Sequence, residues 1–349
     1  MAASPAAQRL VLKTVLSLPA PVLRLMAGGG VVYQGGRTLD PRLQYLAAQA
    51  RSAPPVTGQS PQEVRRANAQ GLPLIAGDPE PGVRWEPLAV PGPTGEIRAR
   101  LYRPAGQDAQ APLMVWAHMG GGVIGDLETT HAFCTLLADK GRGPVLSVDY
   151  RLAPEHRFPA GLEDVLGAYR WARANAETFG APAAEAAIGG DSMGGGFAAA
   201  ICQMLKAAGD PQPVLQLLVY PCVDLASQSA SMTTYAEAFP LGRALMDWFV
   251  GHYLGPQDDP TDPRLSPLRA RELAGLAPAI VVSAGFDPMV DQGEAYAKKL
   301  RAAGVPAVYR CYDGLAHAFT AFTGVVPAAQ VACREIAGLV REGYQGRIA

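Results

Sequence analysis

The sequence predicts an α/β protein in which a mainly parallel β-sheet is covered by helices on both faces. Short apolar runs typical of fully buried strands recur between residues 112 and 313. Most of these runs are separated by stretches with helical periodicity, the pattern of strand–helix–strand units. The chain has 349 residues, 49% of them hydrophobic and 17% charged, so it is able to bury the large core that such a fold needs.

The composition also excludes some partners. The net charge is −1, so the composition has no basic excess that would argue for binding to nucleic acid or to an acidic membrane. The five cysteines are scattered and show no CxxC spacing. This favours free thiols in a reducing, cytoplasmic compartment over a disulfide framework or a zinc site.

The N-terminal stretch "RLVLKTVLSLPAPVLRLMAGGG" has the basic and apolar residues of a signal peptide. However, Lys13 and Pro19 interrupt it, Arg24 follows, and its apolar residues recur at helical spacing. We interpret it as an amphipathic helix of the folded protein, with a signal peptide as the alternative. It is too short and too interrupted to span a membrane.

The remaining elements follow in chain order. A helix is predicted in "DPRLQYLAAQA", and the Pro-rich stretch "SAPPVTGQSP" is predicted as a connector. Residues 83–90 and 96–104 alternate polar and apolar residues around a turn, which predicts an antiparallel strand pair. The buried strands are predicted at 112–118, 144–150, 186–191, 215–221, 279–285 and 307–313, with helices at 161–178, 194–208 and 290–303.

One connection is unusually long. Residues 222–278 lie between two predicted strands and contain "LGRALMDWFVGHYLG". Leu241, Leu245, Trp248, Phe249 and Tyr253 lie near one face of a helix in this stretch. A connection of this length is typically functional, and we predict a lid over a site.

The motif "GGDSMGGG" places Gly190, Ser192 and Gly194 in a GxSxG pattern between a strand and a helix. This is the context of a nucleophile elbow, a sharp turn that holds a strained, exposed serine at a helix N-terminus. Glycine is needed because a β-carbon at either flanking position would clash with neighbouring backbone. A glycine-rich turn with a purely packing role is the alternative, since GxSxG alone also arises by chance.

A serine needs a base to become a good nucleophile, and in the elbow fold the order is serine, acid, then histidine. His118, His131 and His156 precede the serine, which leaves His252 and His317. The first of these two lies in the amphipathic stretch of the long connection. His317 lies between the last predicted strand and the terminal helix, and order and position favour it as the base.

The acid is expected at the carboxyl end of a late strand, where the active sites of open α/β sheets lie. Asp287 directly follows the strand run "IVVSAGF" and would orient the imidazole. Asp224 is the rival position, Asp291 is expected to be exposed, and a helix N-cap is the alternative role for Asp287.

The three glycines of "HMGGGVIGD" follow a predicted buried strand. Bare backbone there exposes N–H groups to which a substrate carbonyl oxygen has close access. Together with the N–H of Met193, the residue after the nucleophile, they predict an oxyanion hole. A flexible surface loop explains the glycines less well.

These motifs resemble those of the hormone-sensitive-lipase-like esterases (bacterial family IV) of the α/β-hydrolase fold. The segments that carry the resemblance are "HMGGGVIGDLETTH", "DYRLAPEHRFPAGLEDV", "GGDSMGGG", "LSPL", "SAGFDPMVDQGEAYAKKLRAAG" and "GLAHAF". The similarity runs from about residue 80 to the C-terminus, and more loosely through "GGRTLDPRLQYL".

The resemblance implies a hydrolase core at 51–221 and 266–349, with a helical cap built from 1–50 and 222–265. It implies the triad Ser192, Asp287 and His317 already reached from chain order. It implies that no metal or organic cofactor is needed. It also implies a homodimer through the last strand, for which the residues themselves give no evidence.

The chain departs from the family pattern of His-Gly-Gly-Gly followed by an aromatic residue. Aligning on "VIGD" puts Met119 at the first glycine and Gly122 at the aromatic residue, so both are candidates for the substrate pocket. The oxyanion donors then map to Gly120 and Gly121, with a shift by one residue to 121–122 left open. Loss of the aromatic residue is expected to open the pocket wall, and the Met193 side chain to narrow it.

The expected activity is serine carboxylesterase, acting on small esters with short to medium acyl chains. One rival is hydrolysis of another acyl compound, such as a lactone, amide or aryl ester, because the same machinery serves them all. A second rival is a small-molecule-binding protein on the same fold, as in plant gibberellin receptors. Such receptors tend to lose the histidine that is present here as His317.

Overall fold

The computed structural model describes residues 4–348 and contains an eight-stranded sheet as its central layer. Every strand predicted from the apolar runs is present in it. The strands are β3 (Val83–Gly92), β4 (Gly95–Pro104), β5 (Leu113–Ala117), β6 (Val145–Val148), β7 (Ala186–Asp191), β8 (Gln216–Val219), β9 (Ala279–Phe286) and β10 (Ala307–Ala316).

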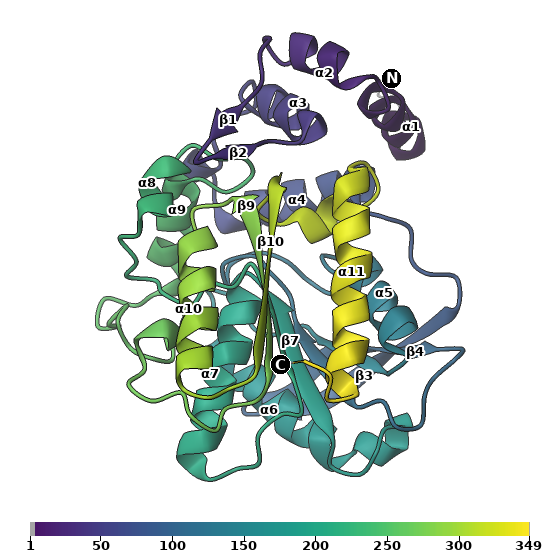
Figure 1. Ribbon diagram of the computed structural model, residues 1–349, viewed down its shortest axis with the longest axis vertical. Helices are drawn as coiled ribbons and strands as arrows, with labels where there is room; N and C mark the ends of the chain where they lie inside the picture. The colour runs from purple at the N-terminus through teal and green to yellow at the C-terminus, as the bar shows by residue number, and fades with distance from the viewer. Residues whose placement is uncertain (1–3, 349) are drawn as a thin grey trace.

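The strand order is β10-β9-β8-β7-β5-β6-β4-β3. The strands from β10 to β6 pair in parallel, whereas β4 pairs antiparallel with both β6 and β3. The predicted mainly parallel sheet and antiparallel pair are therefore confirmed. Because neighbouring parallel strands point the same way, the segments after β5, β7, β9 and β10 all begin at the carboxyl ends of the strands, on the same side of the sheet (Figure 1).

Helices cover both faces of this sheet (Figure 1). On one face α6, α7 and α10 pack against the central strands, and on the other face α5 and α11 pack against each other and the sheet. These helices are α5 (His131–Gly141), α6 (Ala160–Ala174), α7 (Met193–Ala208), α10 (Val290–Ala302) and α11 (Pro327–Tyr344). Short 3₁₀ turns lie between them, namely η2 (Ala176–Phe179), η3 (Pro267–Arg269) and η4 (Phe319–Phe322).

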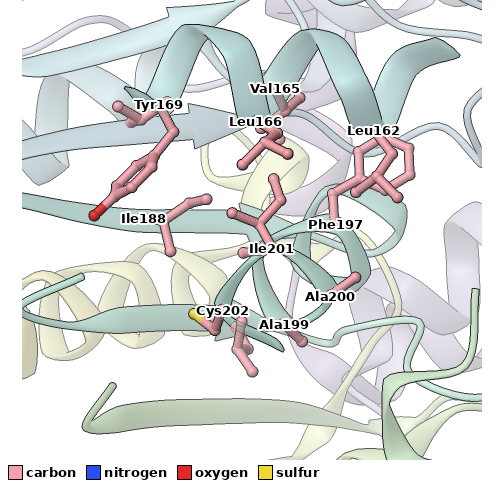
Figure 2. Packing of buried hydrophobic residues seen from close by; sticks show 14 of the residues in the cluster. Leu162, Val165, Leu166, Tyr169, Ile188, Phe197, Ala199, Ala200, Ile201 and Cys202 are labelled. Carbon is pink, nitrogen blue, oxygen red and sulfur yellow. The ribbon is translucent and has the colours of Figure 1, made fainter. Parts of the chain in front are cut away.

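The two covered faces give two hydrophobic cores. Along β5, Leu113 and Val115 belong to the core under α6 and α7, whereas Met114 and Trp116 belong to the core under α5 and α11. Figure 2 shows part of the first core, where side chains of α6 lie over Ile188 of β7 and over the side chains of α7. A strand buried on both faces must be apolar at every position, which is why these strands read as continuous apolar runs.

The N-terminal region forms helices that lie at one end of the molecule (Figure 1). The stretch interpreted as one amphipathic helix is two helices, α1 (Pro5–Leu16) and α2 (Ala20–Met26), because Pro19 has no N–H to continue the first. After the small hairpin of β1 (Tyr33–Gln34) and β2 (Arg37–Thr38) come α3 (Pro41–Ala50), η1 (Val56–Gly58) and α4 (Pro61–Ile75). In residues 4–348 no helix is long and apolar enough to cross a bilayer.

The long connection between β8 and β9 holds the helix expected there. It forms α9 (Arg243–Tyr253), preceded by the short α8 (Ala230–Thr234). In Figure 1 both lie at the same end of the molecule as the N-terminal helices. Two segments that are more than 150 residues apart in the sequence therefore gather near the carboxyl ends of the strands.

Candidate active site

Ser192 lies on the tight turn between β7 and α7. Its backbone has φ 54° and ψ −118°, a strained conformation for a residue with a side chain. A β-carbon on Gly190 would lie 2.3 Å from the carbonyl carbon of Gly194, and one on Gly194 would lie 2.0 Å from the carbonyl oxygen of Ala117. The turn therefore closes only with glycine at both positions, as predicted.

His317 joins the serine to an acid. It follows β10 directly, and its Nε2 lies 2.9 Å from Oγ of Ser192. Its Nδ1 lies 2.7 Å from Oδ2 of Asp287, the residue after β9. A carboxylate only accepts hydrogen bonds, so Nδ1 donates and Nε2 is left to accept from the serine hydroxyl. All three side chains are buried.

Asp287 is held in place by its own backbone surroundings. Its Oδ1 accepts a hydrogen bond of 2.8 Å from the N–H of Met289, so the carboxylate both caps the next turn and orients the imidazole. The helix-capping role weighed for this residue and a role at the site are thus compatible.

The rival residues have other partners. Asp224 accepts from Nε of Arg269 at 2.7 Å, and Asp291 accepts from the N–H of Ser231 at 2.8 Å. Asp291 is half-buried, where exposure was expected. The ring of His252 packs edge-on against Trp248 within α9.

The glycine loop after β5 presents its backbone to the site. Gly120, Gly121 and Gly122 have φ values of 126°, 63° and 72°, which side chains rarely adopt. Within the described chain, the N–H groups of Gly120, Gly121 and Met193 donate to no protein oxygen. They are therefore free to donate to a ligand.

A buried histidine holds this loop, and sequence reasoning gave it no role. His118 stacks on Tyr150 with ring centroids 4.2 Å apart, and the Tyr150 hydroxyl donates to the His118 carbonyl oxygen. The His118 Nδ1 lies 2.7 Å from the carbonyl oxygen of Met119. Burial lowers the pKa of His118, so its imidazole is neutral and supports the glycine loop through these contacts. The one feature of the sequence that indicates this role is the position of His118 just before the three glycines.

A second unforeseen group lies behind the serine. The buried carboxyl of Asp191 accepts from the hydroxyls of Tyr220 at 3.0 Å and Thr320 at 3.1 Å. Burial raises the pKa of Asp191 to about 7, against these two hydrogen bonds, which lower it. The Tyr220 ring in turn packs on the imidazole of His317, 4.7 Å between centroids. This cluster supports the back of the site.

The serine opens into a cavity of about 680 Å³. Its walls come from the glycine loop, from α9, and from the N-terminal helices α1, α3 and α4. Among the described lining residues none is Asp, Glu, Lys or Arg. The cavity thus suits an uncharged, apolar ligand.

Comparison with known proteins identifies the family of the chain. Residues 114–321 match the model of a family described by the alpha/beta hydrolase fold. The chain is 43% identical to carboxylic ester hydrolase LipN of Mycobacterium tuberculosis, over 86% of this chain and 82% of that protein. The chain belongs to the hormone-sensitive-lipase-like carboxylesterases of the α/β-hydrolase fold.

Further relatives and solved structures fit the same family. The chain is 33% identical to an ethyl acetate hydrolase of Pseudomonas putida, over 79% of this chain and 88% of that protein. An α/β hydrolase enzyme from the metagenome of Lake Arreo superposes with a TM-score of 0.84 at 40% identity, over 88% of this chain and 99% of that one. A hyperthermophilic esterase from Pyrobaculum calidifontis superposes with a TM-score of 0.81 at 35% identity, over 89% of this chain and 99% of that one.

At one position this carboxylesterase differs from what its sequence led us to expect. Met119 lines the cavity, but Gly122 does not, and the wall there is not opened. A β-carbon on Gly122 would lie 2.7 Å from the ring of Tyr253, and one on Gly121 would lie 2.4 Å from the ring of Phe249. Rings from α9 therefore fill the space that an aromatic residue in the loop would occupy.

Proposed function

We propose that the chain is a serine carboxylesterase in which Ser192 is the nucleophile, His317 the general base and Asp287 the residue that orients the imidazole. The observation that carries the proposal is the imidazole itself, with one nitrogen 2.9 Å from the serine hydroxyl and the other 2.7 Å from the carboxylate. That arrangement activates a hydroxyl at neutral pH.

The reaction proceeds through an acyl-enzyme. Oγ of Ser192 attacks the ester carbonyl carbon while its proton passes to Nε2 of His317. Collapse of the tetrahedral intermediate breaks the ester C–O bond, and the same proton moves to the departing alcohol. Water then attacks the acyl carbonyl carbon while Nε2 of His317 takes its proton. Collapse of this second tetrahedral intermediate breaks the bond to Oγ of Ser192, which takes the proton back, and the carboxylic acid is released.

The oxyanion hole in this proposal consists of the N–H groups of Gly120, Gly121 and Met193. Each such donor typically contributes about 2.7–4 kcal/mol to transition-state stabilisation. Their lack of protein acceptors supports the assignment. Because Gly122 lies off the cavity, the register on the first two glycines is favoured over the shifted one.

Uncharged esters with short to medium acyl chains are the proposed substrates. The apolar walls and the cavity volume of about 680 Å³ support this class. The relatives named ethyl acetate hydrolase and arylesterase, the latter from Saccharolobus solfataricus and 37% identical, support small esters. Hydrolysis of a lactone, an amide or an aryl ester by the same residues is the second candidate function, and the relative named arylesterase favours the aryl ester among these three.

We also propose that residues 1–50 and 222–265 form the cap over a core of 51–221 and 266–349. Leu12 and Leu46 from the first segment and Leu241 and Phe249 from the second line the cavity, which supports this division. Helix α4, which these bounds assign to the core, also lines the cavity through Val64 and neighbouring residues, so the core contributes to the cavity wall as well.

A cytoplasmic location and a homodimer complete the proposal. The five free cysteines support a reducing compartment. Strand β10 lies at the edge of the sheet, where strands of two copies could pair. Light scattering on purified protein measures the second point directly.

The test uses p-nitrophenyl butyrate and an organophosphate. We expect the wild-type enzyme to release p-nitrophenol from the ester and to incorporate one phosphoryl group from the organophosphate, found on the peptide that carries Ser192. Ser192→Ala should abolish both, whereas Ser283→Ala, which removes another buried serine outside the cavity, should retain both.

Labelling at any other residue, or an unchanged rate in Ser192→Ala, would contradict the proposal. A panel of alkyl esters, aryl esters, lactones and amides at fixed enzyme concentration separates the esterase from the second candidate function. Binding of esters without any turnover would instead indicate a non-catalytic member of the fold.

A further inference from the structure

The N-terminal helices expose an unusual amount of apolar surface. Among residues 4–348, seven of the nine large apolar side chains that are exposed lie between residues 10 and 33. We call these seven side chains the N-terminal apolar face: Leu10, Val11, Val22, Leu25, Met26, Val31 and Tyr33. Exposed apolar side chains are ordinary when scattered singly, but a cluster of this kind marks a binding surface.

The two helices that carry most of this face bury few of their side chains. In α1 only Leu16 is fully buried, and in α2 only Leu23. Leu10 is 67% exposed and Leu25 is 75% exposed, although both are large aliphatic residues. Packing against α3 and α4 therefore accounts for one side of these helices and leaves the outer side uncovered.

The helices that carry this face also adjoin the cavity of the candidate active site. Leu12 of α1 lines the cavity, while Val11 and Leu10, one and two positions earlier, are exposed on the same helix. Leu46 of α3, against which α2 packs, lines the cavity as well. An apolar molecule at this surface would thus be next to the apolar wall that leads to Ser192.

The charge of the segment selects the kind of partner. Residues 1–39 contain four basic residues and no Asp or Glu, in a chain whose net charge is −1. Arg9 and Lys13 lie 2.9 Å and 4.0 Å from Asp78, and Arg37 lies 2.9 Å from Asp313. Arg24 on α2 has no acidic partner within ion-pair distance among the described residues. Apolar residues beside basic ones are the pattern of helices that lie in the headgroup region of anionic membranes.

We propose that the N-terminal apolar face docks on an anionic lipid surface and presents the cavity to esters dissolved in it. Helices α1 and α2 have 12 and 7 residues, too short to span a bilayer, so they lie along it. The docking stands on the exposed residues and the charge. Only the delivery of esters rests on the proposed esterase function.

The first experiment measures binding of the full chain to vesicles. The probes are vesicles of phosphatidylcholine alone and of phosphatidylcholine mixed with phosphatidylglycerol, separated by flotation. We expect binding to the anionic vesicles, weaker binding to the neutral ones, and a loss at high salt because screening removes the electrostatic part.

Two variants each place one charge on the face, and a matched third variant places one charge elsewhere. Leu25→Glu in α2 and, independently, Leu10→Glu in α1 should each weaken partitioning about tenfold or more, since each replaces a leucine that inserts into the lipid with a charge that the lipid disfavours. Val331→Glu on α11 alters a side chain that is 56% exposed but lies outside the face, and should bind like the wild type. Thermal unfolding checks that all three variants fold.

The second experiment measures hydrolysis of one long-chain ester held in the vesicles and one short ester in free solution. Leu25→Glu should slow the first and leave the second unchanged, because Leu25 does not line the cavity. Vesicle binding with no hydrolysis of either ester would support docking and contradict the esterase instead.

Three results would overturn the docking proposal. One is equal partitioning of wild type and Leu25→Glu, and another is an equal loss in Val331→Glu. The third is a dimer in light scattering that Leu25→Glu dissociates, without vesicle binding by the wild type. That last outcome would assign the face to a second copy of this chain.

Discussion

The ring of Phe249 packs directly against the backbone of Gly121. A β-carbon on this glycine would lie 2.4 Å from Cγ of the ring, and Tyr253, one turn later on α9, covers Gly122 in the same way. The long connection between β8 and β9 thus touches the very loop whose N–H groups we assign to the oxyanion hole. A substitution of Phe249 in α9 is therefore expected to alter both the wall of the cavity and the packing of the glycine loop.

Removing the Phe249 ring should broaden the range of substrates. In Phe249→Ala we expect kcat/KM to shift toward longer or bulkier acyl chains, because the ring lines the cavity. A series of p-nitrophenyl esters of increasing chain length measures this. Trp248→Ala, which alters the neighbouring ring on α9 that does not line the cavity, should leave the preference unchanged; an equal shift in both would contradict a wall specific to Phe249.

A methyl group on Gly121 should be poorly tolerated. Gly121→Ala adds a clash with Phe249 and forces a side chain into φ 63°, which alone costs roughly 1–2 kcal/mol. We expect a lower free energy of unfolding together with a lower kcat. Gly251→Ala on α9 has open space around it and should stabilise by about 0.5–1 kcal/mol. Urea unfolding of both variants gives the comparison.

The acid can be tested against its rival by isosteric changes. Asp287→Asn replaces the carboxylate with a neutral amide whose NH2 group is able to donate to Nδ1 of His317. That favours the wrong imidazole tautomer and leaves the imidazolium without a countercharge, so we expect kcat to fall by about ten-thousandfold. Asp224→Asn, whose carboxylate bonds Arg269 instead, should keep most of the activity. A large loss in the second variant and a small one in the first would assign the acid to Asp224.

The buried carboxyl of Asp191 should make stability depend on pH. Burial raises its pKa to about 7 in the folded protein, above the ordinary value near 3.8 that the unfolded chain retains. The folded state therefore holds the proton more tightly, and the contribution to the free energy of unfolding is lost as pH rises from about 4 through 7. Relative to wild type, Asp191→Asn should gain stability over that interval, by an amount on the order of a few kcal/mol. Chemical unfolding at several pH values measures it, and a flat difference would contradict the assignment.

Thiol reagents should leave the enzyme active. Cys222 lines the cavity near the serine, but burial raises the pKa of its thiol to about 12. At pH 8 only about one thiol in ten thousand is then ionised. We expect iodoacetamide not to inactivate the enzyme under conditions in which an organophosphate does. Rapid inactivation that Cys222→Ala prevents would show a reactive thiol at the site.

The sequence by itself predicted the sheet, its covering helices and the residues that meet at its edge. Strands buried on both faces must be apolar throughout, and the carboxyl ends of parallel strands lie at one edge. Chain order then singled out Ser192, Asp287 and His317, which the structure brings within hydrogen-bond distance. Each of these inferences uses information local to one segment or fixed by topology.

Only the tertiary structure decided what surrounds those residues. The packing of Phe249 and Tyr253 on the glycine loop, the contact of Tyr220 with Asp191, and the cavity wall from α1 and α4 join segments far apart in the chain. Periodicity reports that a residue is apolar and faces inward, but not which distant residue it meets. Those contacts depend on how whole elements pack, and the substrate cavity consists mainly of them.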